Sequence, residues 1–306
     1  MRLAALSLLA FVLAGCTTPE QADEMPLGWT DEDRLVVAEA AFAAERVALE
    51  SQSVLYQFPT APVSPALPTG VVSTIVVASC INEERAQPAL TRMAAQPADL
   101  AILLGDNVYG SWTAQDPVIS DLRSAYWQQS RKEEFRTLVS TRPTLAVWDD
   151  HDFGVNDGGG ETFPQRELAR QMFVRFWSLG EDSPQNHPDG VYGAYHFGPE
   201  GQRLQVIILD TRFNRSPLAA TPERNAPGRE RWIPDESPER TMLGAAQWVW
   251  LEEQLRQPAD LRLVISSVQI VAEGHGWERW GNFPLEQQRF YDLVRETGAR
   301  GVVIVS

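Results

Sequence analysis

One segment, Thr144-Leu145-Ala146-Val147-Trp148-Asp149-Asp150-His151-Asp152, indicates both the type of fold and the chemistry. It begins as a short apolar run, which is typical of a strand buried on both faces. The run then changes at once into three carboxylates and one imidazole. Carboxylates this close together repel one another in a low dielectric unless a cation neutralises them or water screens them. A solvated acidic turn has no need to follow a buried strand, so the pattern favours a metal site.

Polar side chains follow other apolar runs in the same way. The run 71–79 leads into Ser79-Cys80, and the run 99–104 leads into Gly105-Asp106-Asn107-Val108-Tyr109. In open α/β sheets, ligands bind beyond the carboxyl ends of the strands. We therefore expect these groups to meet at one edge of a sheet.

The order of the elements predicts an α/β fold. Strands are expected at 71–79, 99–104, 144–148, 203–209, 261–266 and 301–305. Helices are expected at 85–96, 117–140, 164–178, 243–256 and 284–297. Alternation of this kind is typical of strands connected through helices. Residues 180–240, rich in proline and glycine, are expected to form irregular loops.

The ligand types favour particular metals. A carboxylate (Asp106), a phenolate (Tyr109) and a thiolate (Cys80) on one ion suit iron better than magnesium. The carboxylate of Asp150 and the amide of Asn156 suit a harder cation such as calcium or manganese. For Cys80, burial as a small hydrophobic residue is the alternative to a ligand role.

Composition limits the class of protein. The chain has 306 residues, of which 43% are hydrophobic and 22% are charged. These values exclude a disordered or collagen-like chain. Asp and Glu total 41 against 26 Lys and Arg, which gives a net charge of −15. Because a phosphate-backbone binder needs a basic surface, we expect no stable nucleic-acid complex.

The N-terminus carries an export signal. Arg2 precedes an apolar run from Leu3 to Leu13, which ends in Leu13-Ala14-Gly15-Cys16. The run is too short for a bilayer span, and it resembles a signal peptide (1–15) with a bacterial lipobox that lipidates Cys16. An ordinary signal peptide that happens to contain Cys is the alternative. Thr17 in place of Asp favours the periplasmic side of the outer membrane. We expect membrane contact through this lipid anchor only, with no transmembrane helix.

The mature chain divides into two parts. Residues 16–69 are expected to form a lipidated tether, with a helix from Thr30 to about Ser51 and a proline-rich linker at 58–69. The main domain is expected to span 70–306.

These blocks resemble the PhoD-like alkaline phosphatases, a branch of the calcineurin-like metallophosphatases. The supporting residues are Ser79-Cys80, Gly105-Asp106 with Tyr109, Trp148 to Asp152, Leu209-Asp210-Thr211-Arg212, Thr241 to Gly244 with Gln247-Trp248, and Trp277 with Phe283-Pro284. The resemblance implies two packed sheets flanked by helices, an αββα sandwich. It also implies a binuclear or trinuclear metal site, with iron and calcium favoured and zinc or manganese as alternatives.

The resemblance also implies roles for individual residues. Cys80, Asp106 and Tyr109 would bind iron, and Asp106 would bridge to a second metal. Asp150 and His151 fall on the positions of a metal ligand and of a transition-state stabiliser or general acid. The remaining candidates are Asp149 and Asn156 as metal ligands, Arg212 as the phosphate-binding catalytic arginine, and Asn107, Arg215 and His275 as substrate contacts. For both arginines a surface ion pair is the alternative.

The expected function follows from the family. It is the hydrolysis of phosphate monoesters or diesters, with small phosphate esters or phospholipid head groups as substrates. The family pattern continues with Gly-Asp-x-His after a strand like 301–305, whereas this sequence stops at Ser306. We therefore expect a C-terminally incomplete domain, as a fragment or as a true truncation. The alternative function is a catalytically impaired lipoprotein that binds metal or phosphate esters.

Overall fold

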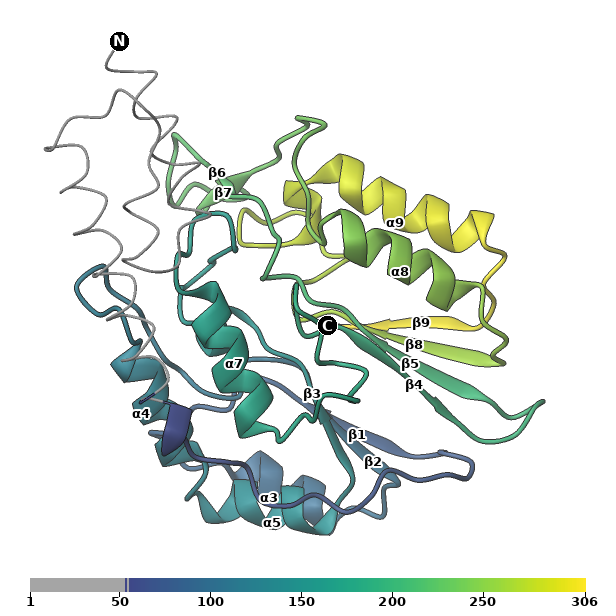
Figure 1. Ribbon diagram of the computed structural model, residues 1–306. Helices are drawn as coiled ribbons and strands as arrows, with labels where there is room; N and C mark the ends of the chain where they lie inside the picture. The colour runs from purple at the N-terminus through teal and green to yellow at the C-terminus, as the bar shows by residue number, and fades with distance from the viewer. Residues whose placement is uncertain (1–52, 54) are drawn as a thin grey trace, which may run out of the picture. The chain divides into compact units, whose positions relative to one another are not determined.

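The computed structural model describes residue 53 and residues 55–306, and its first sheet is built from three parallel strands (Figure 1). The strands β1 (Ile75–Ala78), β2 (Leu100–Leu103) and β3 (Thr144–Ala146) lie in that order. The central strand β2 is buried along its whole length, which explains its unbroken apolar sequence. Because the strands are parallel and in register, the loops that follow them emerge at one edge.

The second sheet contains the four strands β4 (Gly193–Phe197), β5 (Leu204–Ile208), β8 (Leu261–Ile265) and β9 (Val302–Val305). β4 pairs antiparallel with β5, whereas β5, β8 and β9 run parallel. Parallel strands need crossover connections, and helices provide them here. The segments after β8 and β9 therefore leave the sheet at the same end.

Helices cover the outer faces of the two sheets. The α-helices between residues 55 and 306 are α3 (Pro88–Ala95), α4 (Ser120–Gln129), α5 (Glu133–Thr141), α6 (Asp150–Phe153, a short helix after β3), α7 (Arg166–Phe176), α8 (Ala245–Leu255) and α9 (Pro284–Glu296). Figure 1 shows α3 and α5 beyond the first sheet and α8 and α9 beyond the second, with the two sheets between them. The predicted αββα arrangement of two sheets flanked by helices is confirmed.

A buried glutamate joins α9 to α8 and to the turn that precedes α8. Glu286, in the first turn of α9, accepts hydrogen bonds from Trp248 Nε1 (2.7 Å), Thr241 Oγ1 (2.8 Å) and the Met242 amide (2.8 Å). Trp248 and Met242 belong to the hydrophobic core over this sheet. The block Thr241 to Gly244 is therefore a structural element that sets where α8 begins.

Some elements differ from the sequence expectation. The helix predicted at 117–140 is two helices, because Lys132 adopts an extended conformation (φ −65°, ψ 126°) that ends helical geometry between α4 and α5. The region 180–240 was expected to be irregular, but it contains β4 and a two-stranded ribbon of β6 (Ala219–Ala220) and β7 (Trp232–Ile233).

The proline-rich segment 58–69 has neither helix nor strand, yet it belongs to the same compact unit as the domain, which begins at Phe58. The Ala61 amide donates to the Phe176 carbonyl at 2.7 Å, and the Phe58 ring lies 5.5 Å from that of Tyr126. The predicted signal peptide, Cys16 and the helix expected before Ser51 lie outside the described residues. Among those described, no helix is long and apolar enough to cross a bilayer.

Candidate active site

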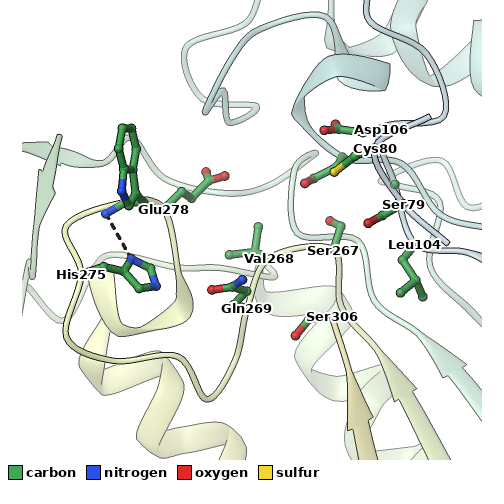
Figure 2. A pocket seen from close by; sticks show the side chains of 13 residues that line it. Ser79, Cys80, Leu104, Asp106, Ser267, Val268, Gln269, His275, Glu278 and Ser306 are labelled. Atoms are coloured by element: carbon green, nitrogen blue, oxygen red, sulfur yellow. Dashed lines mark hydrogen bonds between the residues drawn. The ribbon is translucent and has the colours of Figure 1, made fainter. Parts of the chain in front are cut away.

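A cavity of about 530 Å³ opens where the carboxyl ends of the two sheets meet (Figure 2). Five strands contribute to its lining through the residues that follow them. These are Ser79 and Cys80 after β1, Gly105 and Asp106 after β2, Asp149 after β3, Ser267 to Gln269 after β8, and Ser306 after β9. The loop with His275, Trp277 and Glu278 completes the wall. The expected gathering of polar groups at the strand ends is therefore present in the fold.

Two of the lining residues have unusual backbone conformations. Cys80 and Asp106 both have positive φ, at 57° and 51°. Non-glycine residues in this region cost free energy and cluster at functional sites. The backbone of one supports the other, because the Cys80 amide donates to Gly105 O (3.3 Å) and the Ile81 amide donates to Asp106 O (2.7 Å). The two turns thus hold the thiol and the carboxylate against the same cavity.

The phenol of Tyr109 lies with these two groups. Its pKa is raised first by burial and then by the charges of Asp106 and Cys80, with which it interacts directly. The Tyr109 ring also packs on the imidazole of His151, with ring centroids 4.3 Å apart. Four donor types expected from the sequence, a thiol, a carboxylate, a phenol and an imidazole, therefore converge.

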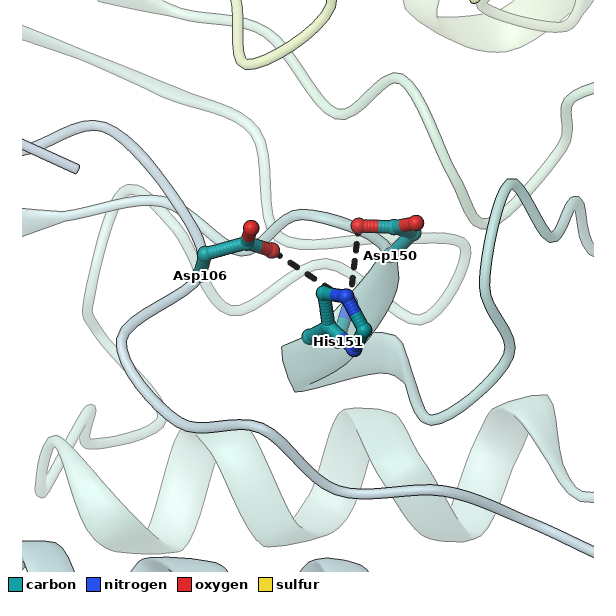
Figure 3. A group of neighbouring side chains, drawn as sticks. All are labelled: Asp106, Asp150 and His151. Carbon is teal, nitrogen blue, oxygen red and sulfur yellow. Dashed lines mark hydrogen bonds between the residues drawn. The ribbon is translucent and has the colours of Figure 1, made fainter. Parts of the chain in front are cut away.

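Asp106, Asp150 and His151 form a group that can hold a metal ion (Figure 3). One ligand atom from each lies within 4.8 Å of the others. The backbone amide of His151 donates to Asp106 Oδ1 (3.4 Å) and to Asp150 Oδ1 (3.0 Å), so the first turn of α6 is tied to the end of β2. The pKa of Asp106 is raised by burial and by the nearby carboxylates, because both disfavour its negative charge.

A second group, Asp150, Asp157 and Glu278, also brings ligand atoms within 4.8 Å of one another. Asp157 donates its amide to Asp150 Oδ2 at 2.7 Å. The sequence prediction missed both Asp157 and Glu278. Asp157 directly follows the predicted ligand Asn156, and Glu278 directly follows Trp277, so the signal was one residue away in each case.

Asn156 is placed differently from its expected role. Its side chain is exposed and faces a separate cavity that Arg231 and Trp232 also line, and its amide oxygen can accept from Arg231 Nη1 at 2.9 Å. It belongs to neither of the two ligand groups. Asp157 lines the same separate cavity, and its Oδ2 accepts from Arg231 Nη1 (2.8 Å) and Trp232 Nε1 (2.9 Å), but unlike Asn156 it also belongs to a ligand group.

Arg212 and Arg215 were expected to contact phosphate, or else to form surface ion pairs. Both are fully buried, and neither is among the residues that line the cavity. Arg212 bonds Asp149 and both carboxylate oxygens of Glu278, and Arg215 Nη2 lies 3.2 Å from Glu278 Oε1. The carboxylates of Asp149 and Glu278 thus pair with these arginines from the cavity side, because a fully buried guanidinium group requires a counter-charge.

Asn107 also points away from the cavity. It is fully buried, and its Nδ2 donates to Val147 O (2.8 Å) and to Asp152 Oδ1 (2.9 Å). Asp152 in turn accepts the Asp149 amide at 3.0 Å. Burial raises the pKa of Asp152 to about 7, although these hydrogen bonds work against the rise. Asn107 therefore positions the Trp148-to-Asp152 turn, in contrast to the expected substrate contact.

Two further candidates do lie at the cavity. His275 lines it, and its Nδ1 accepts the Trp277 amide at 3.2 Å. Asp149 lines it as well, while its Oδ1 remains paired with Arg212. Among the described residues, Asp149 belongs to neither ligand group. Its carboxylate is held by Arg212 instead.

Comparisons with known proteins identify the family and the fold. A model of the PhoD-like phosphatase family matches residues 75–306. A solved structure titled "Structure of PhoD" has the same fold, with a TM-score of 0.62 at 22% identity, over 79% of this chain and 52% of that chain. The chain therefore spans about half the length of that structure. No curated protein matches. The family match covers both sheets and every ligand candidate above, and the chain belongs to the PhoD-like phosphatase family.

Proposed function

We propose that this chain is a metal-dependent phosphoric ester hydrolase that cleaves phosphate monoesters or diesters. One observation carries the proposal: Asp106 lines the cavity together with Cys80, and its carboxylate also lies within 4.8 Å of ligand atoms of Asp150 and His151, so groups from three different strand ends come together. Membership of the PhoD-like phosphatase family supports the same reaction class. The cavity volume of about 530 Å³ suits a small phosphate ester or the head group of a phospholipid.

The residues present fit a metal centre. Asp149, Asp150 and Asp152 add negative charge around buried Asp106, and a bound cation would neutralise this repulsion. Thiolate, phenolate and carboxylate from Cys80, Tyr109 and Asp106 suit iron. The carboxylates of Asp150, Asp157 and Glu278 suit calcium, and zinc or manganese are the alternatives. When bound, such ions supply Lewis-acid activation of water and of the phosphoryl oxygens.

The protein side chains orient the substrate and move the proton. His151 is fixed by the Tyr109 ring and by its backbone bonds to Asp106 and Asp150, so its imidazole is held beside the ligand group. This position suits proton donation to the leaving-group oxygen. His275 lines the same cavity and is available to contact the ester. Arg212 acts indirectly, since it keeps Asp149 and Glu278 in place.

The test compares p-nitrophenyl phosphate with bis(p-nitrophenyl) phosphate, after the protein has been loaded with iron and calcium. Asp106→Asn should abolish turnover and metal retention. It removes the carboxylate that lines the cavity with Cys80 and belongs to the ligand group with Asp150 and His151. Asp99→Asn is the matched control, since Asp99 caps the opposite end of β2. Hydrolysis that persists in Asp106→Asn contradicts the proposed site. Stoichiometric metal uptake without any turnover would instead select the metal-binding lipoprotein.

We also propose that the protein is exported and lipid-anchored through Cys16, at the periplasmic side of the outer membrane. The sequence supports this through Arg2, the apolar run to Leu13 and the Leu-Ala-Gly-Cys ending. Labelled palmitate should enter the wild-type protein and should not enter Cys16→Ala. Separation of inner and outer membranes then tests the location, and recovery in the inner membrane contradicts it.

A further inference from the structure

A second polar cavity, of about 350 Å³, lies at the other end of the second sheet. Its residues precede β5, β8 and β9 and follow the carboxyl ends of α8 and α9. The active-site cavity is lined by residues that follow β8 and β9 at their opposite ends, among them Ser267 and Ser306. The length of the strands therefore separates the two cavities, and the second one plays no part in the proposed chemistry.

Arginine dominates the lining of this second cavity. Arg203, Arg256, Arg262 and Arg300 face it, together with the two carboxylates of Glu200 and Asp260. This excess of positive charge occurs on a chain whose net charge is −15. We call these four arginines and the space between them the arginine cavity.

Most of this positive charge is not paired within the cavity. Asp260 Oδ2 accepts the backbone amide of Arg203 at 2.8 Å, and Arg256 pairs with Glu252 along α8 (2.7 Å). Among the described residues, the side chains of Arg203 and Arg300 have no hydrogen bond and no ion pair. Two guanidinium groups are therefore available to a ligand.

Arg262 gives the cavity a buried positive floor. Arg262 is only 5% exposed. Its Nη atoms donate to the carbonyl oxygens of Ala259 (3.1 Å), Arg300 (2.8 Å) and Gln257. Its Nε is buried and has no partner. Neutral carbonyl groups do not cancel the charge, and a buried donor without an acceptor is unfavourable. An anion in the cavity would supply a counter-charge beside Arg262.

The pKa of a neighbouring histidine reflects the same positive charge. The pKa of His196, on β4, is lowered first by burial and then by the positive charges of Arg203 and Arg262. The repulsion reaches across the edge of the sheet to a second strand. The positive potential is thus a property of this end of the sheet as a whole.

We propose that the arginine cavity binds an anion with phosphate groups, held by the guanidinium groups of Arg203 and Arg300 above the buried charge of Arg262. Guanidinium groups match phosphate oxygens with paired, charge-assisted hydrogen bonds. The volume exceeds that of one phosphate group, so a diphosphate or the phosphate of an anionic lipid head group fits the same chemistry. This site is independent of the proposed hydrolase activity.

The first test uses pyrophosphate and the metal-free full chain in EDTA, with isothermal titration calorimetry. The wild-type protein should bind one pyrophosphate. The double variant Arg203→Ala/Arg300→Ala should bind it about tenfold more weakly or worse, as expected for the loss of charge-assisted hydrogen bonds. Arg92→Ala removes one exposed positive charge on α3, and it should bind like the wild type. Asp106→Asn should also bind like the wild type, because the active-site cavity lies elsewhere.

The second test separates a soluble anion from a lipid. If a lipid head group enters the cavity, vesicles that contain phosphatidylglycerol should bind the wild-type protein, whereas pure phosphatidylcholine vesicles should not. The double variant should not bind to either kind of vesicle. Arg300→Glu alone, at an exposed position, guards against misfolding of the double variant and should lose binding of either ligand. Equal binding of pyrophosphate and of vesicles by wild type, double variant and Arg300→Glu would overturn the proposal. So would an equal loss in Arg92→Ala.

Discussion

Arg212 holds Asp149 at the cavity wall through two donors on one oxygen, since both Nε (2.8 Å) and Nη2 contact Asp149 Oδ1. The same guanidinium donates to Glu278 Oε1 (2.7 Å) and Oε2 (2.6 Å). Both carboxylates line the cavity, whereas Arg212 is fully buried behind them. The arginine therefore fixes two acidic groups whose mutual repulsion would otherwise push them apart.

Replacing Arg212 by Gln should destabilise the fold strongly. The change leaves Asp149 and Glu278 without their buried counter-charge, and breaking a buried ion pair from one side costs about 3–5 kcal/mol. Urea unfolding at pH 7 measures the loss, with Arg92→Gln as the control for removal of an exposed charge. Arg212→Lys should recover only part of the stability, because an ammonium group lacks the two-pronged geometry. An unfolding midpoint for Arg212→Gln equal to that of the wild type would contradict the network.

Replacing Cys80 by Ser should weaken iron binding selectively. A hydroxyl is a poorer ligand than a thiolate for iron, while the oxygen ligands for a harder cation are unaffected. Metal content after loading, measured by mass spectrometry, should show less iron and unchanged calcium. Ser79→Ala changes the neighbouring residue of the same cavity wall and should retain both metals. Iron content that is unchanged in Cys80→Ser would rule out a ligand role for the thiol.

Replacing Gly105 by Ala should displace the end of β2 from Asp149. A Cβ at this position would lie 2.6 Å from Asp149 Cβ and 3.1 Å from Ser267 Cβ, and φ is +106°. Both the contact and the backbone conformation are unfavourable, so we expect a loss of about 2 kcal/mol or more in the free energy of unfolding. Gly180→Ala is the control, because no atom lies within 4 Å of its Cβ. Comparable stability of the two variants would show that the strand ends are not closely packed.

Asp99 should contribute to stability in a pH-dependent way. Its Oδ2 accepts hydrogen bonds from the Ser73 amide (2.8 Å), the Thr74 amide (2.9 Å) and the Ser73 hydroxyl (3.0 Å), and these bonds lower its pKa in the folded state. The unfolded pKa is about 3.9. Because the folded pKa of Asp99 lies below its unfolded pKa, the ionised carboxylate stabilises the fold above the unfolded pKa. This stability is lost as the pH falls through the folded pKa.

The measurement is the urea midpoint of Asp99→Asn against wild type at several pH values. The variant should be less stable at pH 7, and the difference should shrink below about pH 4 as the wild-type carboxylate takes up its proton. Asp182→Asn, at an exposed position between α7 and β4, controls for the general effect of removing an acidic charge. A difference in midpoint that stays constant from pH 7 to pH 3 would contradict the assignment.

The sequence alone determined the class of the fold and the elements that supply the site. The continuous apolar run 100–103 predicts a strand buried on both faces, and the polar residues after such strands are then expected at one edge of the sheet. The position of Asp106, Asp150 and His151 at that edge follows from the order of the residues along the chain. These are local properties, and they do not depend on how the two sheets pack.

Which side chains take part in the site follows from contacts between distant segments. Asn156 and Asp157 are neighbours in one turn, and the local sequence does not show which of them joins a ligand group. Arg212 resembles a phosphate-binding residue until the fold buries it between Asp149 and Glu278, which are far apart in the sequence. The physical reason is that burial and charge pairing are set by contacts between distant segments, whereas the local pattern fixes only the type of element and the order in which it occurs.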